Sequence, residues 1–547
     1  NASNGTSTAN GGTSSAKGGT EMASATFYTA LGSTSAADRV TIDIIVTTPL
    51  VENGAAGAVG TGQPRSRFLD VATLSEFCRN TCGKLRWLKF DSSDCYGYSQ
   101  TLSEEIVRSA TAFSGNDAIF KVRCSSGVEV DSFLPVSQTP GILVDDSVLS
   151  SPELELSTIT SDTCVAIQLR HKIGGIPKES GASTGRDPTV YFQSALLYTT
   201  AAGSRRVRVS TLALQSTSVP SEVFRLSDFG AVTAFTTRQA ITDMLRPDGS
   251  GTHKVAREAI VKRCVDLLAN YRLNTSAKNS PSGQLILPEA LQLLPLFCLS
   301  LRKSLIFRPS LPKGSWSTRP SPTADERAYH IHHGAAVSPA LAMLSVHSNL
   351  YVVTKLRKRD GEWIIPTPLP SSNTVGTSAD EASIASASCR SYIQLPKSAH
   401  PSITSIDDDG IYLLDDGFVL YLYVGKAVPV DVREDFLIFD NSSRQTPVIS
   451  STSGSGRKLT KIAWQMRSFC SMGGVGASML RPTTAPIVVV FAGGAGSNGN
   501  QVDDLKHKFL EDKLITLLVD DTTAHETFYS DFLCQLHRRI QEKIDKK

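Results

Sequence analysis

The residues best suited to bind a charged partner lie in a pair of strand-like stretches between residues 187 and 214. The first stretch is rich in aromatic, aliphatic and β-branched residues, and a glycine-containing turn follows it, so the sequence predicts a β-hairpin. In the second stretch Val207 and Val209 alternate with Arg206 and Arg208, which makes one face apolar and the other cationic. The arginines either form a solvated sheet face or bind an acidic partner, and both interpretations stay open.

A glycine-rich segment, 494–499, fits the GxGxxG pattern of dinucleotide-binding sites and follows an apolar strand at 486–491. Asp520 and Asp521 lie near the distance at which such a site places its acidic residue. However, only about 45 residues follow the glycines, too few for a six-stranded dinucleotide fold. The preferred interpretation is a loop, and a nucleotide-dependent enzyme is the alternative.

Three further groups of residues are candidates for metal binding. The segment Tyr329–His333 holds three histidines without an HExxH motif, and Asp407–Asp409 lacks the spaced ligands of a calcium loop. Cys78 and Cys82 are the one close cysteine pair, and no second pair completes a zinc site. Core or surface histidines, solvated turn carboxylates and reduced buried thiols are the preferred interpretations. The sequence has no GxSxG, P-loop or catalytic cysteine signature.

Composition sets the class of protein. The chain has 547 residues, 20% charged residues and a net charge of +3, which predicts several domains and argues against a dedicated nucleic-acid binder. The one basic run is the short Lys355–Arg359. The sequence contains neither an apolar run long enough to span a bilayer nor a signal peptide. Scattered cysteines favour the cytosol.

The elements that must position these residues fall into a multidomain α+β chain. A buried strand at 39–46, a helix at 69–81 and a strand at 84–90 predict a parallel α/β unit, about half of a doubly wound domain. From 117 to 218 the pattern is β, with a strand at 117–124, a return strand at 128–133 and another at 163–169 before the hairpin, which predicts a sandwich.

The second half of the chain predicts helices and then a mixed domain. Helical spacing covers 235–244 and 255–271, and 285–301 is expected to be a buried helix with Pro288 in its first turn. A strong hairpin is expected at 410–424 with Asp416 and Gly417 in the turn. A buried strand at 487–491 and an amphipathic helix at 528–543, with Phe532, Leu536 and Ile540 on one face, complete the chain.

Several of these segments together resemble the two inner-coat subunits of the COPII vesicle coat. The similar segments follow the family's domain order. The hairpin is represented by 192–212 and the helical domain by 262–271, 285–295 and 325–329. The gelsolin-like domain is represented by 409–417 and 424–425, and the closing helix by 528–537. The strand 120–127 favours the cargo adaptor over its GTPase-activating sister, which is kept as an alternative, as is an actin-binding relative of gelsolin.

The resemblance implies a non-enzymatic subunit with a partial α/β (von Willebrand A-like) trunk, a β-sandwich, an all-helical domain and a gelsolin-like α/β domain. The expected divisions are 1–25 disordered low-complexity sequence, 26–112 the C-terminal half of the trunk, 113–219 the sandwich, 220–356 the helical domain, 357–390 a Ser/Pro-rich insert or linker, and 391–547 the gelsolin-like domain with its C-terminal helix. The family's zinc ribbon and the front of the trunk are expected upstream, so no cofactor is expected within this chain.

The resemblance also assigns a binding site. The aligned cargo-binding positions are Lys121, Arg123 and Leu197, and Lys121 departs from the family's arginine, losing the bidentate fork that grips a carboxylate. Lys121 and Arg123 lie two residues apart and project from one face of a strand. The implied ligands are acidic sorting signals in the cytosolic tails of membrane cargo and SNARE proteins.

Other implied partners are the GTPase-activating subunit, the small GTPase of the coat and an acidic membrane surface. The membrane contact is expected to be peripheral, and Arg205, Arg206 and Arg208 are candidates for it. No nucleic acid is implied. The implied location is cytoplasmic, at endoplasmic reticulum exit sites and on COPII vesicles, in transport from the endoplasmic reticulum to the Golgi.

Overall fold

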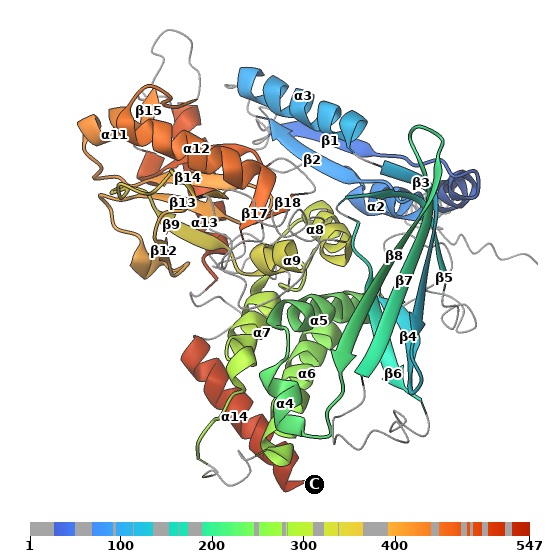
Figure 1. The fold of residues 1–547 in the computed structure, drawn as a ribbon. Coiled ribbons are helices and arrows are strands. Elements are labelled where there is room, and N and C mark those ends of the chain that lie inside the picture. The colour runs from blue at the N-terminus through green and yellow to red at the C-terminus, as the bar shows by residue number, and fades with distance from the viewer. Residues whose placement is uncertain are drawn as a thin grey trace, which may run out of the picture.

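The computed structural model describes the chain in four packed regions (Figure 1). The described residues are 27–49, 68–90, 95–112, 114–134, 153–161, 163–172, 189–245, 251–275, 281, 283–309, 322–336, 338–364, 392–438, 448–471, 478–481, 485–494, 501–519 and 528–546. The segment 1–25, predicted to be disordered, lies wholly outside the described residues. The predicted insert at 357–390 lies mostly outside them, since only 357–364 are described. No described helix has the length and apolar character needed to cross a membrane.

The first region is the predicted parallel α/β unit, but its first strand lies at 44–49 and not at the predicted 39–46. Strand β1 (Ile44–Pro49) pairs in parallel with β2 (Leu85–Phe90), and α2 (Val71–Asn80) connects them. A helix over 27–37 precedes β1, and α3 (Cys95–Thr111) follows β2. The buried Arg86 of β2 pairs with the buried Glu105 of α3 at 2.6 Å, so an ion pair without water access fixes α3 on the strand.

The second region is the predicted β-sandwich. Its larger sheet has the strand order β5-β3-β7-β8 and its smaller sheet pairs β4 with β6. The bounds are β3 Ser114–Cys124, β4 Val128–Leu134, β5 Glu153–Thr160, β6 Ala166–His171, β7 Thr189–Thr200 and β8 Arg205–Gln215. Between the sheets lie Ala118, Leu154 and Leu156 of the large sheet and Phe133 of the small one.

The predicted strands and hairpin are confirmed, but one pairing is corrected. Residues 128–134 do form a strand, yet the turn at 125–127 carries the chain to the opposite sheet, where β4 pairs with β6 instead of returning along β3. The neighbours of β3 are β7 and β5, and β5 is a strand that the sequence analysis did not predict. The side chains of Val128 and Phe133 are buried, and this explains the crossing. They fill the space between the two sheets only when β4 lies in the sheet opposite β3.

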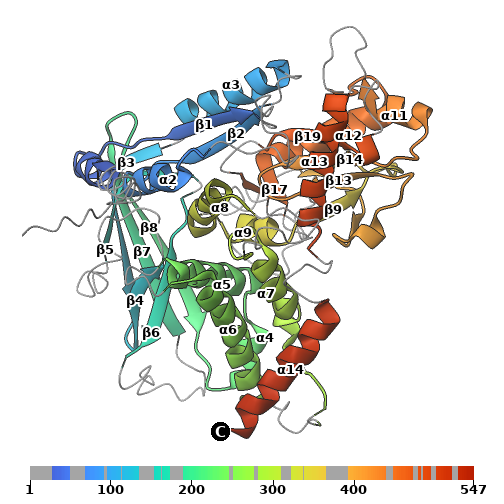
Figure 2. The same cartoon turned by 180° about the vertical axis from the view of Figure 1, so that it is seen from behind.

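The third region is helical. Its elements are α4 (Pro220–Arg225), α5 (Phe229–Met244), α6 (His253–Asn274), a 3-10 turn η2 (Glu289–Leu291), α7 (Leu294–Lys303), α8 (Ala324–Ala336) and α9 (Pro339–Val346). The last helix of the chain, α14 (Tyr529–Asp545), packs on α6 and α7 through the predicted face of Phe532, Leu536 and Ile540. Figure 2 shows α14 lying along the lower end of these helices.

The helix predicted over 285–301 is wrong in its first half. Pro288 has an extended backbone conformation, with ψ of 139°, and only η2 follows it. The α-helix begins at Leu294, with Pro295 in its first turn. A helix across both prolines would lack the N–H group of Pro295 in its interior and would place the proline ring against the preceding turn, so the chain starts the helix there instead.

The fourth region is a mixed sheet with the order β12-β9-β13-β14-β19. Its strands are β9 (Asn349–Val352), β12 (Ser398–Ala399), β13 (Ile411–Asp415), β14 (Leu420–Val424) and β19 (Ile487–Phe491). Helix α12 (Gly454–Ser468) covers one face and α13 (Gln501–Leu517) the other. The predicted hairpin is confirmed, and both its strands are wholly buried because each face carries a helix.

Smaller elements complete this region. They are β10 (Trp363–Ile364), β11 (Tyr392–Ile393), η3 (Ile403–Ser405), α11 (Val430–Phe436), β15 (Leu437–Ile438), β16 (Val448–Ile449), β17 (Phe469–Ser471), β18 (Ser478–Leu480) and η4 (Ala492–Gly494).

Helix α8 joins three of the four regions. The buried carboxylate of Asp325 accepts hydrogen bonds from the backbone N–H groups of Leu69 (2.8 Å) and Val71 (2.9 Å) at the start of α2. An imidazole nitrogen of His333 lies 3.0 Å from the carbonyl oxygen of Leu85 in β2. On its other side α8 meets Phe418, from the turn of the β13–β14 hairpin, whose ring centroid lies 5.2 Å from that of His333.

The three histidines of α8 therefore belong to a packed junction. Burial lowers the pKa of His332 to about 4, and burial lowers the pKa of His333 well below its usual value. Both imidazoles are thus neutral at pH 7 inside the folded protein. Among the described residues, no group of three or more His, Cys, Asp or Glu side chains is arranged to hold a metal ion.

Removing the carboxylate of Asp325 should loosen the contact between α8 and α2. Asp325→Ala leaves two backbone N–H groups without their acceptor, one of them on the fully buried Val71, and we expect a loss of about 2 kcal/mol in stability. Hydrogen exchange of the Leu69 and Val71 amides should quicken in the variant. Asp228→Ala, which removes a local cap from α5, is the control and should leave these two amides unchanged. Unchanged exchange in Asp325→Ala would contradict this role.

The buried histidines should make the fold sensitive to acid. Because the folded-state pKa of His332 is below its unfolded value, the unfolded chain binds a proton between about pH 6.5 and pH 4 that the folded chain does not, so stability falls as the pH falls through this window. For His332 the loss between pH 7 and pH 5 is about 2 kcal/mol.

Urea denaturation at pH 7 and pH 5 measures this loss. His332→Gln, which cannot take up a proton, should show a smaller drop than the parent protein. An identical drop in His332→Gln and the parent would refute the assignment.

Candidate binding site

The three residues predicted to bind a ligand share one face of the larger sheet of the sandwich. Lys121 and Arg123 alternate along β3 with the buried Val122, so their side chains leave the same side of the strand. Leu197 of β7 lies directly opposite Ile119, and Ala195 lies opposite Lys121. Cross-strand partners lie on one face. The structure therefore places Lys121, Arg123 and Leu197 on one face of the sheet, with Leu197 nearest to Ile119.

The face continues across all four strands, and we call it the outer sheet face. Its members are Glu153 and Glu155 of β5, Ile119, Lys121 and Arg123 of β3, Gln193, Ala195 and Leu197 of β7, and Val207, Val209 and Thr211 of β8. Neighbouring residues on the opposite face, such as Ala118 and Leu154, are buried in the core. The outer sheet face thus carries an apolar centre, with cations on β3 and carboxylates on β5.

The two predicted cations differ in their surroundings. The ammonium group of Lys121 pairs with the carboxylate of Glu153, directly opposite on β5, and the lysine side chain is 33% exposed. Arg123 is exposed and has no acidic partner within the described part of the chain. The guanidinium of Arg123 is thus open to an added carboxylate as far as the described residues go, whereas the ammonium of Lys121 already has Glu153 as a partner.

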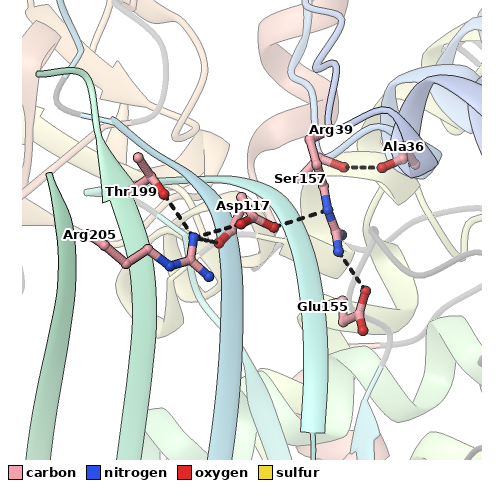
Figure 3. Close-up of polar contacts among 7 residues, drawn as sticks. All are labelled: Ala36, Arg39, Asp117, Glu155, Ser157, Thr199 and Arg205. Atoms are coloured by element: carbon pink, nitrogen blue, oxygen red, sulfur yellow. Dashed lines mark hydrogen bonds and ion pairs between the residues drawn. The ribbon is translucent and has the colours of Figure 1, made fainter. Parts of the chain in front are cut away.

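A network of four charged residues bounds the outer sheet face at one end (Figure 3). Arg39, which follows the helix over 27–37, pairs with Asp117 of β3 at 3.1 Å and with Glu155 of β5 at 2.9 Å. Arg205 of β8 approaches the same Asp117 at 2.6 Å and also donates to the hydroxyl of Thr199. This network fixes the first region to the sandwich, and it occupies Arg205.

The other two predicted arginines point to the opposite side of the sheet. Arg206 is paired across the strands with Tyr198, and Arg208 with Leu196, and both of these partners pack toward the core. Both arginines are nevertheless exposed, because β8 is the last strand in the described sheet and every one of its residues is exposed. Arg206 and Arg208 therefore form a cationic surface distinct from that of Arg123.

Sequence reasoning missed Glu153, Glu155, Asp117 and Arg39. A signal for the first two was present, since Glu153 and Glu155 alternate with Leu154 and Leu156, the period-2 pattern of a half-buried strand. No local pattern marks Arg39 or Asp117 as partners, because their contact joins segments that are separated in the sequence.

The structure bears on the alternative sites only where their residues are described. The strand before the glycine-rich segment is β19, and α13 follows, but 495–500 and the aspartates at 520 and 521 lie outside the described residues. In the aspartate cluster Asp408 pairs with Lys426 at 2.9 Å and Asp407 binds Tyr412. Cys78 and Cys82 are buried, and burial raises the pKa of each thiol.

Three family models match the chain in the order of its regions. The Sec23/Sec24 beta-sandwich domain matches residues 115–217, the Sec23/Sec24 helical domain matches residues 228–344, and the gelsolin repeat matches residues 393–435.

Similar proteins are named for protein transport. The chain is 25% identical over 487 residues to protein transport protein SEC24 B of Arabidopsis thaliana, covering 87% of this chain and 36% of that protein. It is 24% identical over 481 residues to human protein transport protein Sec24C, covering 88% and 36%. The chain thus spans a little over a third of the length of these relatives.

A solved structure shares the fold. The crystal structure of the human COPII-coat protein Sec24c aligns with 94% of this chain and 55% of its own chain, with a TM-score of 0.66 and 21% identity.

Proposed function

We propose that this chain, a homologue of the Sec24 proteins, is part of a vesicle-coat adaptor that holds acidic cytosolic tails on its outer sheet face. The observation that carries the proposal is that Lys121, Arg123 and Leu197, separated by up to 76 positions, meet on one accessible face of one sheet. A cationic pair beside an apolar centre suits a peptide and needs no bond-making group. The proposal is therefore for binding, not catalysis.

The spacing of the face selects an extended peptide. Alternate residues along a strand lie about 7 Å apart, so Ile119, Lys121 and Arg123 form a row with an apolar position followed by two cations. In an extended peptide, alternate side chains have the same spacing as those of the strand. A tail with one apolar and two acidic residues at alternate positions therefore places each of these side chains opposite one member of the row. The preferred signal is thus apolar-x-acidic-x-acidic, in either chain direction.

The two cations contribute unequally. Arg123 presents a planar guanidinium that can bind a carboxylate through two hydrogen bonds, and no described acidic group occupies it. Lys121 offers a single ammonium group that Glu153 already neutralises in part. We therefore assign the stronger acidic contact to Arg123 and a weaker one to Lys121.

The wider role follows from the relatives' names and is part of the proposal. The chain acts with a GTPase-activating coat subunit and a small GTPase, at the cytoplasmic surface of the endoplasmic reticulum, in transport toward the Golgi. Arg206 and Arg208 face away from the peptide site and are free for an acidic membrane or partner subunit, whereas Arg205 is occupied by Asp117. The names of the reported relatives favour the adaptor over its sister subunit.

Replacing Arg123 should weaken binding of a di-acidic tail. For Arg123→Ala we expect an affinity about fivefold lower for a labelled peptide with the apolar-x-acidic-x-acidic pattern, because one exposed charged contact contributes about 1 kcal/mol. Fluorescence anisotropy against salt concentration measures this, and the salt dependence should also become shallower.

Arg208→Ala is the matched control, since it removes the same kind of side chain from the opposite face of the same sheet. Its peptide affinity should equal that of the parent. Equal weakening in both variants would mean that overall charge, and not the outer sheet face, attracts the peptide. Unchanged affinity in Arg123→Ala would remove the site.

Releasing Lys121 from its internal partner should have the opposite effect. Glu153→Gln leaves the strand in place and removes the carboxylate that competes for Lys121, so we expect peptide affinity to rise about two- to threefold. The double variant Glu153→Gln with Lys121→Gln should lose this gain. A gain that persists in the double variant would show that Glu153 acts through general repulsion of the peptide.

A further inference from the structure

The outer face of α12 carries a pattern that the sheet site does not use. Arg457, Lys461 and Trp464 follow helical spacing and are exposed, whereas Leu459, Ile462 and Met466 pack into the core against the five-stranded sheet. A solvated helix face usually lacks a large apolar ring. Here the indole of Trp464 is 54% exposed.

A loop from the basic run meets the same helix and brings a second tryptophan. The ammonium group of Lys458 donates to the carbonyl oxygens of Arg357 (2.8 Å) and Lys358 (3.2 Å), which fixes the loop on α12. Gly361, with φ of 78°, then lies so close to α12 that a Cβ atom at this position would stand 3.1 Å from the Cα of Lys458. The loop delivers Trp363 to Trp464, with ring centroids 6.3 Å apart and planes inclined by 62°.

The loop and the exposed face of α12 that carry the two tryptophans also carry five exposed cations. Lys355, Lys358, Arg359, Arg457 and Lys461 are exposed, and none has an acidic partner within the described residues. Arg357, by contrast, is engaged by Asp360. The segments 355–364 and 454–467 contain one exposed carboxylate, that of Glu362. We call the two tryptophans and these five cations the tryptophan patch.

Charge and ring geometry decide what fits the tryptophan patch. A second copy of this chain would bring five like charges against five, which disfavours a symmetric contact. Each indole is about half covered, with exposed fractions of 52% and 54%, and the two lie against each other instead of projecting beyond the charges. Rings held in this way suit stacking of a ligand group better than insertion into a bilayer.

We propose that the tryptophan patch binds an acidic peptide segment of a partner protein, with a proline or aromatic side chain of that segment stacked on Trp363 and Trp464 and its carboxylates on Arg457, Lys461 and Lys358. Tryptophan and arginine dominate binding energy where peptides meet protein surfaces. The surface is separate from the outer sheet face, and the inference does not depend on the proposed function.

The probe is a panel of labelled acidic nonapeptides with proline, tryptophan or leucine at the centre, each with a neutral twin in which amides replace the carboxylates. Anisotropy against the whole chain should show binding of the proline or tryptophan peptides, with affinity at least about tenfold above their neutral twins. Trp464→Ala and Lys461→Glu should each weaken binding about tenfold. Both positions are exposed, so the circular dichroism spectrum should stay that of the parent.

Lys254→Glu reverses an exposed lysine on α6 and is the matched control, with affinity expected to stay at the parental value. Three results would overturn the proposal. The first is that the acidic peptides bind no better than their neutral twins, and the second is that the control weakens binding as much as the two variants do. The third is that Trp464→Ala and Lys461→Glu leave peptide binding unchanged and instead abolish binding to phosphatidylserine vesicles or self-association.

Discussion

The arrangement of the regions depends on a carboxylate that caps a helix from a distant part of the chain. Asp325 of α8 accepts from the first backbone N–H groups of α2, which have no partner within their own helix. The same helix contacts β2 through His333 and the β13–β14 hairpin through Phe418. On one side α8 accepts hydrogen bonds from the first region, and on the other its His333 ring packs against Phe418 of the mixed sheet. Both of these regions are therefore positioned by α8.

This constraint reaches the outer sheet face through a second set of contacts. Arg39 leaves the first region and joins Asp117 and Glu155 on two neighbouring strands of the sandwich, so the sheet is oriented by the region that α8 caps. In this network the carboxylate of Glu155 forms an ion pair with Arg39, just as the carboxylate of Glu153 forms one with Lys121. Arg123 is the cation of this face whose charge the described residues leave available. The internal ion pairs therefore decide which cations of this face remain open to the proposed ligand.

The sequence predicted what local patterns control. The β7–β8 hairpin, the parallel pairing of β1 with β2 and the buried face of α14 were all expected, because turn residues, apolar runs and helical spacing act within a few positions. One error arose where a distant contact decides, since the turn after β3 carries the chain to the other sheet because Phe133 completes the core there. The other error was local, because Pro295 sets the start of α7 and outweighs the apolar residues before it.

The candidate site shows the same division. The periodicity of β3 was enough to place Lys121 and Arg123 on one side of a strand, and the register of β7 then brought Leu197 beside Ile119. No local pattern indicated that Glu153 would neutralise Lys121 or that Asp117 would occupy Arg205, since a carboxylate partner is known only once the strands are paired. The net charge of +3 attracts acidic ligands to the whole molecule without distinguishing among them. On the proposed assignments, discrimination would come from the apolar groups beside each cation, which form a flat row on the sheet and an edge-to-face pair of tryptophan rings, Trp363 of β10 and Trp464 of α12.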